Sequence, residues 1–198
     1  MGMTVDYIML RGLENFLCDF ILEPDYMHKM MRLMTDGIMK KLDRFEREGL
    51  LALNTEGAYV GSGGLGYTDE LPNWKNAPRK ITTQDMWGFE ESQETSTVSA
   101  EMYGEFIFPY HKEIASRFGL NCFGCCESTT TRWQYVKEIP NLRRVSISAW
   151  AEWEKVPEYL GNRYIASFKP IPSPLAMSNL DEDEVRATVK RALDCSKD

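Results

Sequence analysis

The residues best suited to chemistry lie together in the stretch FGLNCFGCCES at positions 118–128. Three of the five cysteines fall there, at positions 122, 125 and 126, and Glu127 follows directly. The apolar start of the stretch predicts a buried strand that opens into a loop. Thiols and a carboxylate at the end of a strand are typical of a metal site or of a nucleophile.

Two interpretations of these cysteines stay open. Cys126 and Cys125 can bind zinc together with Glu127, because zinc accepts sulfur, nitrogen and oxygen ligands in sets of three or four. Adjacent residues of a strand point to opposite faces, so at most one thiol faces a site if the strand continues. In the other interpretation, Cys122 and Cys125 are small buried core residues.

The acidic stretch DMWGFEESQE at positions 85–94 follows or ends a predicted strand. Trp87 can stack on a flat ligand, and Glu91 and Gln93 can contact a substrate. An acidic group there can also act as a general base. The alternative is a solvated acidic loop without a ligand.

Two further substrate contacts are predicted near the ends of later strands. Lys169 directly follows a predicted strand over 164–168, where it can bind an anionic group or remain an exposed lysine. Ser148 lies on a predicted strand over 145–149 and can hydrogen-bond a ligand or fit a tight packing layer.

Residues 55–80 are polar and rich in glycine, and they predict a long loop. The run GSGGLG at 61–66 formally matches a dinucleotide-binding pattern. That pattern requires a strand-to-helix turn, and Leu71-Pro72 argues against a helix here. We expect either a loop over a ligand site, with Tyr67 as its best contact, or plain turn chemistry.

Alternating apolar runs and amphipathic stretches predict a parallel α/β fold. Short apolar runs predict five strands, over 50–54, 81–87, 120–125, 145–149 and 164–168. Amphipathic stripes predict helices over 24–48, 100–117 with a kink at Pro109, 130–139 and 152–160. Asp181 and Glu184 form a capping box that starts a last helix.

Composition narrows the class of protein. A chain of 198 residues with 43% hydrophobic residues predicts one globular domain. The net charge of −7 gives no electrostatic support for a nucleic-acid partner. No apolar run approaches the roughly 18 residues of a membrane span, and we expect no secretory signal. The odd, crowded cysteines argue against a disulfide framework and favour a reducing, cytoplasmic setting.

Longer stretches of the chain resemble the uroporphyrinogen decarboxylase superfamily. They are RGLENFLCDFILEP at 11–24, YVGSGGLGYTDELP at 59–72, the run from Asp85 to Ile114, FGCCE at 123–127, IPNLRRVSISAWAE at 139–152 and YIASFKPIPSPLA at 164–176. The resemblance implies a (β/α)₈ barrel, which typically needs about 250 residues. We therefore expect a partial TIM-type barrel of about five parallel strands, a single domain over 1–198 that is incomplete at both ends.

The superfamily holds two chemistries, and the sequence resembles the second more closely. One branch decarboxylates uroporphyrinogen without a cofactor. The other transfers a methyl group from a corrinoid to a zinc-bound thiol such as coenzyme M. Its zinc enzymes carry His-x-Cys at the matching strand end, where this chain has Gly124 and Cys126. The resemblance thus implies zinc at Cys126 and a corrinoid carried on a partner protein, and it leaves the catalytic residues unknown.

Two alternatives remain. A uroporphyrinogen decarboxylase binds eight carboxylates and needs a pocket rich in arginine and lysine, which the acidic balance of the chain disfavours. A non-catalytic fragment would associate with itself or another chain, because half a barrel exposes sheet edges and an apolar inner face.

Overall fold

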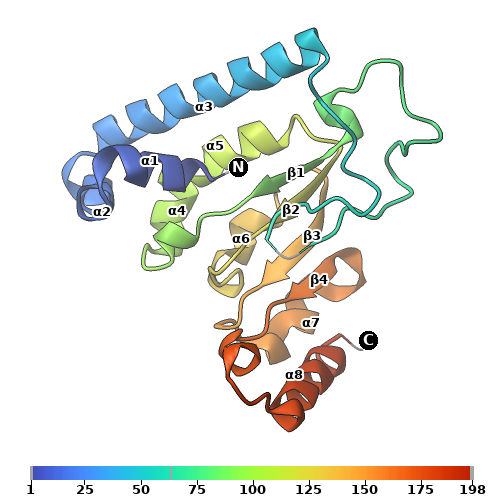
Figure 1. Cartoon of the computed structure of the whole chain (residues 1–198). Coiled ribbons are helices and arrows are strands. Elements are labelled where there is room, and N and C mark those ends of the chain that lie inside the picture. Colours follow the sequence, from blue (N-terminus) through green and yellow to red (C-terminus); the bar gives the residue numbers. More distant parts are fainter. Residues whose placement is uncertain (1, 63, 197–198) are drawn as a thin grey trace.

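The computed structural model describes residues 2–62 and 64–196 and contains a four-stranded parallel sheet with helices (Figure 1). The strands are β1 (Trp87–Glu90), β2 (Leu120–Phe123), β3 (Leu142–Ile147) and β4 (Ile165–Phe168). They lie in the order β1-β2-β3-β4, and every neighbouring pair is parallel. The prediction of a parallel α/β fold is confirmed.

The predicted strand over 50–54 is wrong, because these residues have no regular structure. Asn54 contacts β1 through its side chain and not through its own main chain. Its Oδ1 accepts the N–H of Trp87 and its Nδ2 donates to the carbonyl of Trp87, both at 2.9 Å. The side-chain amide of Asn54 thus occupies both the N–H and the carbonyl of Trp87 at the edge of β1. The sheet therefore has four strands and not five.

Strand β1 begins where the predicted strand over 81–87 was expected to end. The reason is a tight turn at Thr83–Asp85, which is closed by reciprocal capping between Thr82 and Asp85. Extended backbone resumes at Met86. Trp87 therefore lies at the amino end of its strand.

The N-terminal helices are α1 (Met3–Arg11), α2 (Leu13–Leu22) and α3 (Pro24–Glu48). The bounds of α3 match the prediction, with Pro24 in its first turn and Gly49 ending it at φ 67°. The first two helices were not predicted. In Figure 1 the three lie together beside α4 and α5.

The remaining helices connect the strands. The predicted helix over 100–117 is two helices, α4 (Ala100–Phe106) and α5 (Phe108–Ala115), because Pro109 has no N–H to continue the first. The others are α6 (Trp133–Val136), α7 (Val156–Leu160) and α8 (Glu182–Asp194). Asp181 caps α8 by accepting the N–H of Glu184, as predicted.

The two faces of the sheet are covered differently. Phe123, Val145 and Ile147 pack against the helices in one large apolar core. Trp87 and Cys122 face the other way, into a small cluster that Val60 and Leu71 of the long loop complete. Figure 1 shows this loop, between α3 and β1, crossing the sheet. Helices therefore lie on one face and the loop on the other.

Candidate thiol site

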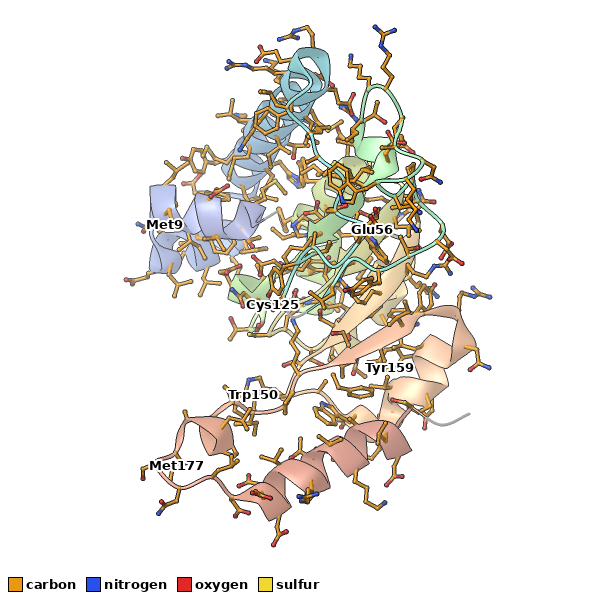
Figure 2. All side chains as sticks on the ribbon, turned by 45° about the vertical axis from the view of Figure 1, so that its right-hand side comes forward. Met9, Glu56, Cys125, Trp150, Tyr159 and Met177 are labelled. Carbon is orange, nitrogen blue, oxygen red and sulfur yellow. The ribbon has the colours of Figure 1, made fainter. Side chains whose placement is uncertain are left out.

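Parallel strands end at the same edge of a sheet, and that edge gathers several of the predicted site residues. Glu91 follows β1, Cys125 and Cys126 follow β2, Ser148 follows β3 and Lys169 follows β4. Figure 2 labels Cys125 in the middle of the molecule, between the helical part and the C-terminal segment.

The two adjacent thiols converge. Strand β2 ends at Phe123, and Gly124 adopts a φ of 99°, so the chain has turned before it reaches the cysteines. The Sγ atoms of Cys125 and Cys126 lie 3.7 Å apart. The expectation that they point to opposite faces does not apply, because they are no longer in a strand. Cys122 is buried as a core residue, whereas Cys125 is half-buried and Cys126 exposed.

The carboxylate of Glu127 holds the loop that carries the thiols. The side chain is buried; Oε1 accepts the N–H of Ser92 at 2.7 Å and Oε2 accepts the N–H of Cys125 at 2.8 Å. Ser148 adds a second tie, since its hydroxyl donates to the carbonyl of Cys126 at 2.7 Å. Both side chains, predicted as a metal ligand and a substrate contact, are engaged with the main chain around the thiols.

The spacing of the two sulfur atoms suits a tetrahedral metal. Two sulfurs at about 2.3 Å from one zinc ion are separated by about 3.8 Å at the tetrahedral angle. The observed separation is 3.7 Å. Across residues 2–62 and 64–196, however, no group of three or more His, Cys, Asp or Glu side chains is arranged to hold a metal. The two sulfurs have the spacing of a zinc-binding pair, and the described residues add no third His, Cys, Asp or Glu ligand to them.

Lys169 lies at the same edge of the sheet as the thiols, directly after β4. Its N–H donates to the carbonyl of Ile147 at 2.9 Å, which extends the β3–β4 ladder by one residue. Nζ is buried and has no hydrogen-bond partner among the described residues. Burial lowers the pKa of Lys169, while the charges of three cysteines and Glu127 act in the opposite direction.

The same groups act on Cys126. Burial raises the pKa of its thiol, and the hydrogen bond and charge of Cys125 act in the same direction. Lys169 opposes this rise, and Glu127 adds to it. The protonation of Cys126 therefore depends on a balance in which Lys169 favours the thiolate.

Glu91 is a second unusual group at this edge. Burial raises the pKa of Glu91 to about 7, with further increases from Glu94 and Glu127. One oxygen of the carboxylate has no hydrogen-bond partner in the described part of the chain. Gln93 lies in the turn that follows, Gln93–Thr95, and its main chain bonds to Glu91. Glu91 can thus hold a proton near neutral pH.

Trp87 and Tyr67 are not brought to the thiols. Trp87 is buried at the amino end of β1, where its Nε1 donates to the carbonyl of Gly66 at 3.1 Å. Tyr67 is exposed and packs on Gly57 within the long loop. Trp87 was expected to close its strand, and the later start of β1 places it at the opposite end from the site.

The glycine-rich run serves close packing. Arg144 donates from Nη2 to the carbonyl of Val60 at 2.5 Å and from Nη1 to that of Leu65 at 2.6 Å. A Cβ on Gly64 would lie 2.1 Å from Cζ of Arg144. No helix follows this run before β1 apart from the turn at Thr83–Asp85, so the segment is not a nucleotide-binding turn.

Sequence reasoning missed two residues that shape the site. The thiol of Cys125 donates to Oγ of Ser62 at 3.0 Å, which joins the long loop to the pair. Arg132 is buried and binds the turn after β1 through Oγ1 of Thr95 at 2.9 Å and the carbonyl of Thr95. Ser62 belongs to the glycine-rich run but Arg132 to no motif, and each is distant in sequence from its partner.

Comparisons of the chain with family models, curated proteins and solved structures found no match. Among the described helices, none combines the length and the apolar character needed to cross a bilayer.

Proposed function

We propose that this chain is part of a TIM-type barrel related to uroporphyrinogen decarboxylase, with its site at the carboxyl ends of the strands. The strand order supports this proposal. In a (β/α)₈ barrel consecutive strands are neighbours and all helices lie outside, whereas a doubly wound sheet reverses its order and has helices on both faces. Here the order is sequential, and one apolar core joins α1–α7 to a single face.

The proposed activity is methyl transfer from a corrinoid on a partner protein to a thiol acceptor. The observation that carries it is the pair of Sγ atoms 3.7 Å apart, at the edge where barrel enzymes place their active sites. Cys125 and Cys126 would hold zinc, which lowers the pKa of an acceptor thiol when bound. Glu127 and Ser148 fix the loop that carries the two donors. Further ligands would come from outside the described residues.

Decarboxylation of a polycarboxylate is less well supported. Arg144 and Arg132 are both buried and bind main-chain carbonyls, so neither offers its guanidinium to a substrate. Lys169 follows β4 at the thiol edge, where the cysteines and Glu127 act to raise its pKa against the effect of burial.

Metal analysis tests the proposal directly. Reduced wild-type protein is compared with Cys126→Ala, Cys125→Ala and Cys18→Ala, the last being an exposed cysteine on α2. We expect one zinc per chain in the wild type and in Cys18→Ala, and loss of zinc in the other two. Wild-type protein without zinc, or retention of zinc in both site variants, would contradict the proposal. Zinc-loaded protein is then assayed for methyl transfer with a corrinoid donor.

A further inference from the structure

An open cavity lies between α6 and α7, two helices that pack on the core face of the sheet. Its volume is about 820 Å³, within the range of roughly 300–1,000 Å³ that is usual for small-molecule sites. Its walls come from α6 and α7, from the turn Gly161–Arg163 and from Tyr164. None of its described lining residues belongs to the thiol site, and Figure 2 shows Tyr159, which lines it, apart from Cys125. We call it the α6–α7 cavity.

Three aromatic side chains line this cavity side by side. The ring of Trp133 lies 5.1 Å from that of Tyr159 and 5.2 Å from that of Tyr164, measured between centroids. All three side chains are half-buried and pack against the large apolar core. Tryptophan and tyrosine rings that remain partly exposed at a cavity wall provide a stacking surface for a flat ligand.

The fold holds these rings in place before any ligand binds. Trp133 is the first residue of α6 and follows Arg132, whose guanidinium is bound to Thr95. The hydroxyl of Tyr159 in α7 lies 3.4 Å from Oγ1 of Thr129. Tyr164 directly precedes β4. Because each ring is carried by a different element of the core, a ligand would find the stacking surface already formed.

The charges of the cavity favour an anionic ligand. Lys137 and Arg163 are exposed, and their side chains form no ion pair, hydrogen bond or ring contact with the described residues. Of the two acids in the cavity, Glu138 already binds Lys112 at 3.1 Å, which leaves Glu158. Two unpaired cations against one further carboxylate give the cavity a positive balance, although the whole chain is acidic.

We infer that the α6–α7 cavity binds a nucleotide, whose base lies against Trp133 and whose phosphate is bound by Arg163 and Lys137. A nucleotide combines the planar ring and the anionic group that these residues suit. Two cations on separate elements match the two charges of a phosphate monoester better than the single charge of a carboxylate, and arginine binds phosphate through two parallel N–H groups. The inference goes beyond the proposed function, because it uses no residue of the thiol site.

The test is isothermal titration calorimetry of the whole chain at low salt with three probes. They are adenosine monophosphate (AMP), adenosine and ribose 5-phosphate. Stacking on aromatic rings tolerates every base, so AMP is a fair probe for the class. We expect AMP to bind saturably at one site. Adenosine, which lacks the phosphate, and ribose 5-phosphate, which lacks the base, should each bind about tenfold more weakly or less.

Variants locate the binding. Trp133→Ala should weaken AMP binding by about tenfold, whereas Trp133→Phe keeps an aromatic face and should retain most of it. Arg163→Met should weaken binding of AMP but not of adenosine, and should reduce the loss of AMP affinity on adding salt. The matched controls are Trp74→Ala and Arg79→Met, which replace exposed residues of the long loop and should bind AMP as the wild type does. Circular dichroism shows that each variant is folded.

Three results would overturn the inference. They are no saturable binding of AMP, unchanged AMP binding in both Trp133→Phe and Arg163→Met together with Trp133→Ala, and equal binding of AMP and ribose 5-phosphate by the wild type. The metal analysis described above is independent of this test. Cys126→Ala should bind AMP as the wild type does, so failure of the thiol site would leave the nucleotide site standing, and the reverse.

Discussion

The carboxylate of Glu127 accepts the backbone N–H of Ser92 at 2.7 Å, across 35 positions of sequence, and so joins the loop after β2 to the loop after β1. The other oxygen accepts the N–H of Cys125. One buried acid therefore fixes the place of the thiols relative to the acidic turn.

Glu127→Gln should weaken this junction. The amide keeps one acceptor oxygen and turns an NH₂ group towards a backbone N–H, which leaves buried donors without an acceptor. We expect a loss of about 1–3 kcal/mol in the free energy of unfolding, measured by urea denaturation. Glu105→Gln, an exposed glutamate on α4, is the matched control and should change stability by less than about 0.5 kcal/mol. Equal effects of the two substitutions would contradict the assigned role.

Asn54→Ala should destabilise the start of β1. The substitution removes the two hydrogen bonds to Trp87 and leaves its N–H and carbonyl unpaired beside a buried indole. We expect destabilisation of about 2 kcal/mol and faster hydrogen exchange at the Trp87 amide. Asn162→Ala, at an exposed position, is the control. Unchanged exchange at Trp87 would show that the side-chain bridge is not formed in solution.

The buried carboxyl of Glu91 should make stability fall as pH rises. Burial raises the pKa of Glu91 to about 7 in the folded chain, from the ordinary glutamate value of 4.5. Between pH 4.5 and pH 7 the unfolded chain loses this proton while the folded chain keeps it, so the free energy of unfolding falls progressively as pH rises. Above pH 7 the loss of free energy is constant. Below pH 4.5 both states are protonated and the penalty disappears.

Glu91→Gln removes that penalty. We expect the variant to exceed the wild type in unfolding free energy by about 1–2 kcal/mol at pH 8, and to match it at pH 4. Urea denaturation at the two pH values measures both differences. Glu14→Gln, an exposed glutamate on α2, should give no pH-dependent difference. A Glu91→Gln protein that is less stable than the wild type at pH 8 would show that the ionised carboxylate is needed.

Arg144 should hold the long loop against the sheet. Its guanidinium binds the carbonyls of Val60 and Leu65, so Arg144→Met releases the segment from the sheet. We expect limited proteolysis to cut between residues 58 and 66 at least tenfold faster than in the wild type, because the freed backbone becomes accessible. Gly64→Ala should have the same effect, since its Cβ would displace the guanidinium. Arg163→Met, on an exposed turn, should leave the cleavage pattern unchanged.

Local signals explain what the sequence could predict. Helix α3 was placed correctly because Pro24 and Gly49 mark its ends and its apolar stripe repeats at helical spacing. The strand over 50–54 was wrong because an apolar run does not reveal whether a sheet edge is free to pair with it. At this point of β1 the edge is occupied by the side chain of Asn54.

The site depends on contacts that no local pattern encodes. The convergence of Cys125 and Cys126 follows from the backbone turn at Gly124, where φ is 99°. The engagement of Glu127 depends on Ser92, and that of Cys125 on Ser62. Residue type and position at strand ends were enough to identify the cysteines, Glu127 and Lys169. They did not show which of these side chains contact one another.

The closeness of the two thiols has a consequence for oxidation. Neighbouring Cα atoms are about 3.8 Å apart, shorter than the roughly 4.4–6.8 Å that an ordinary disulfide spans. The pair is therefore poorly shaped to close on itself, although its sulfurs almost touch. If a peroxide oxidised the exposed Cys126 to a sulfenic acid, condensation with a thiol of another molecule and release of water would be favoured over closure of the pair, so the chain would gain a mixed disulfide in place of an internal bridge.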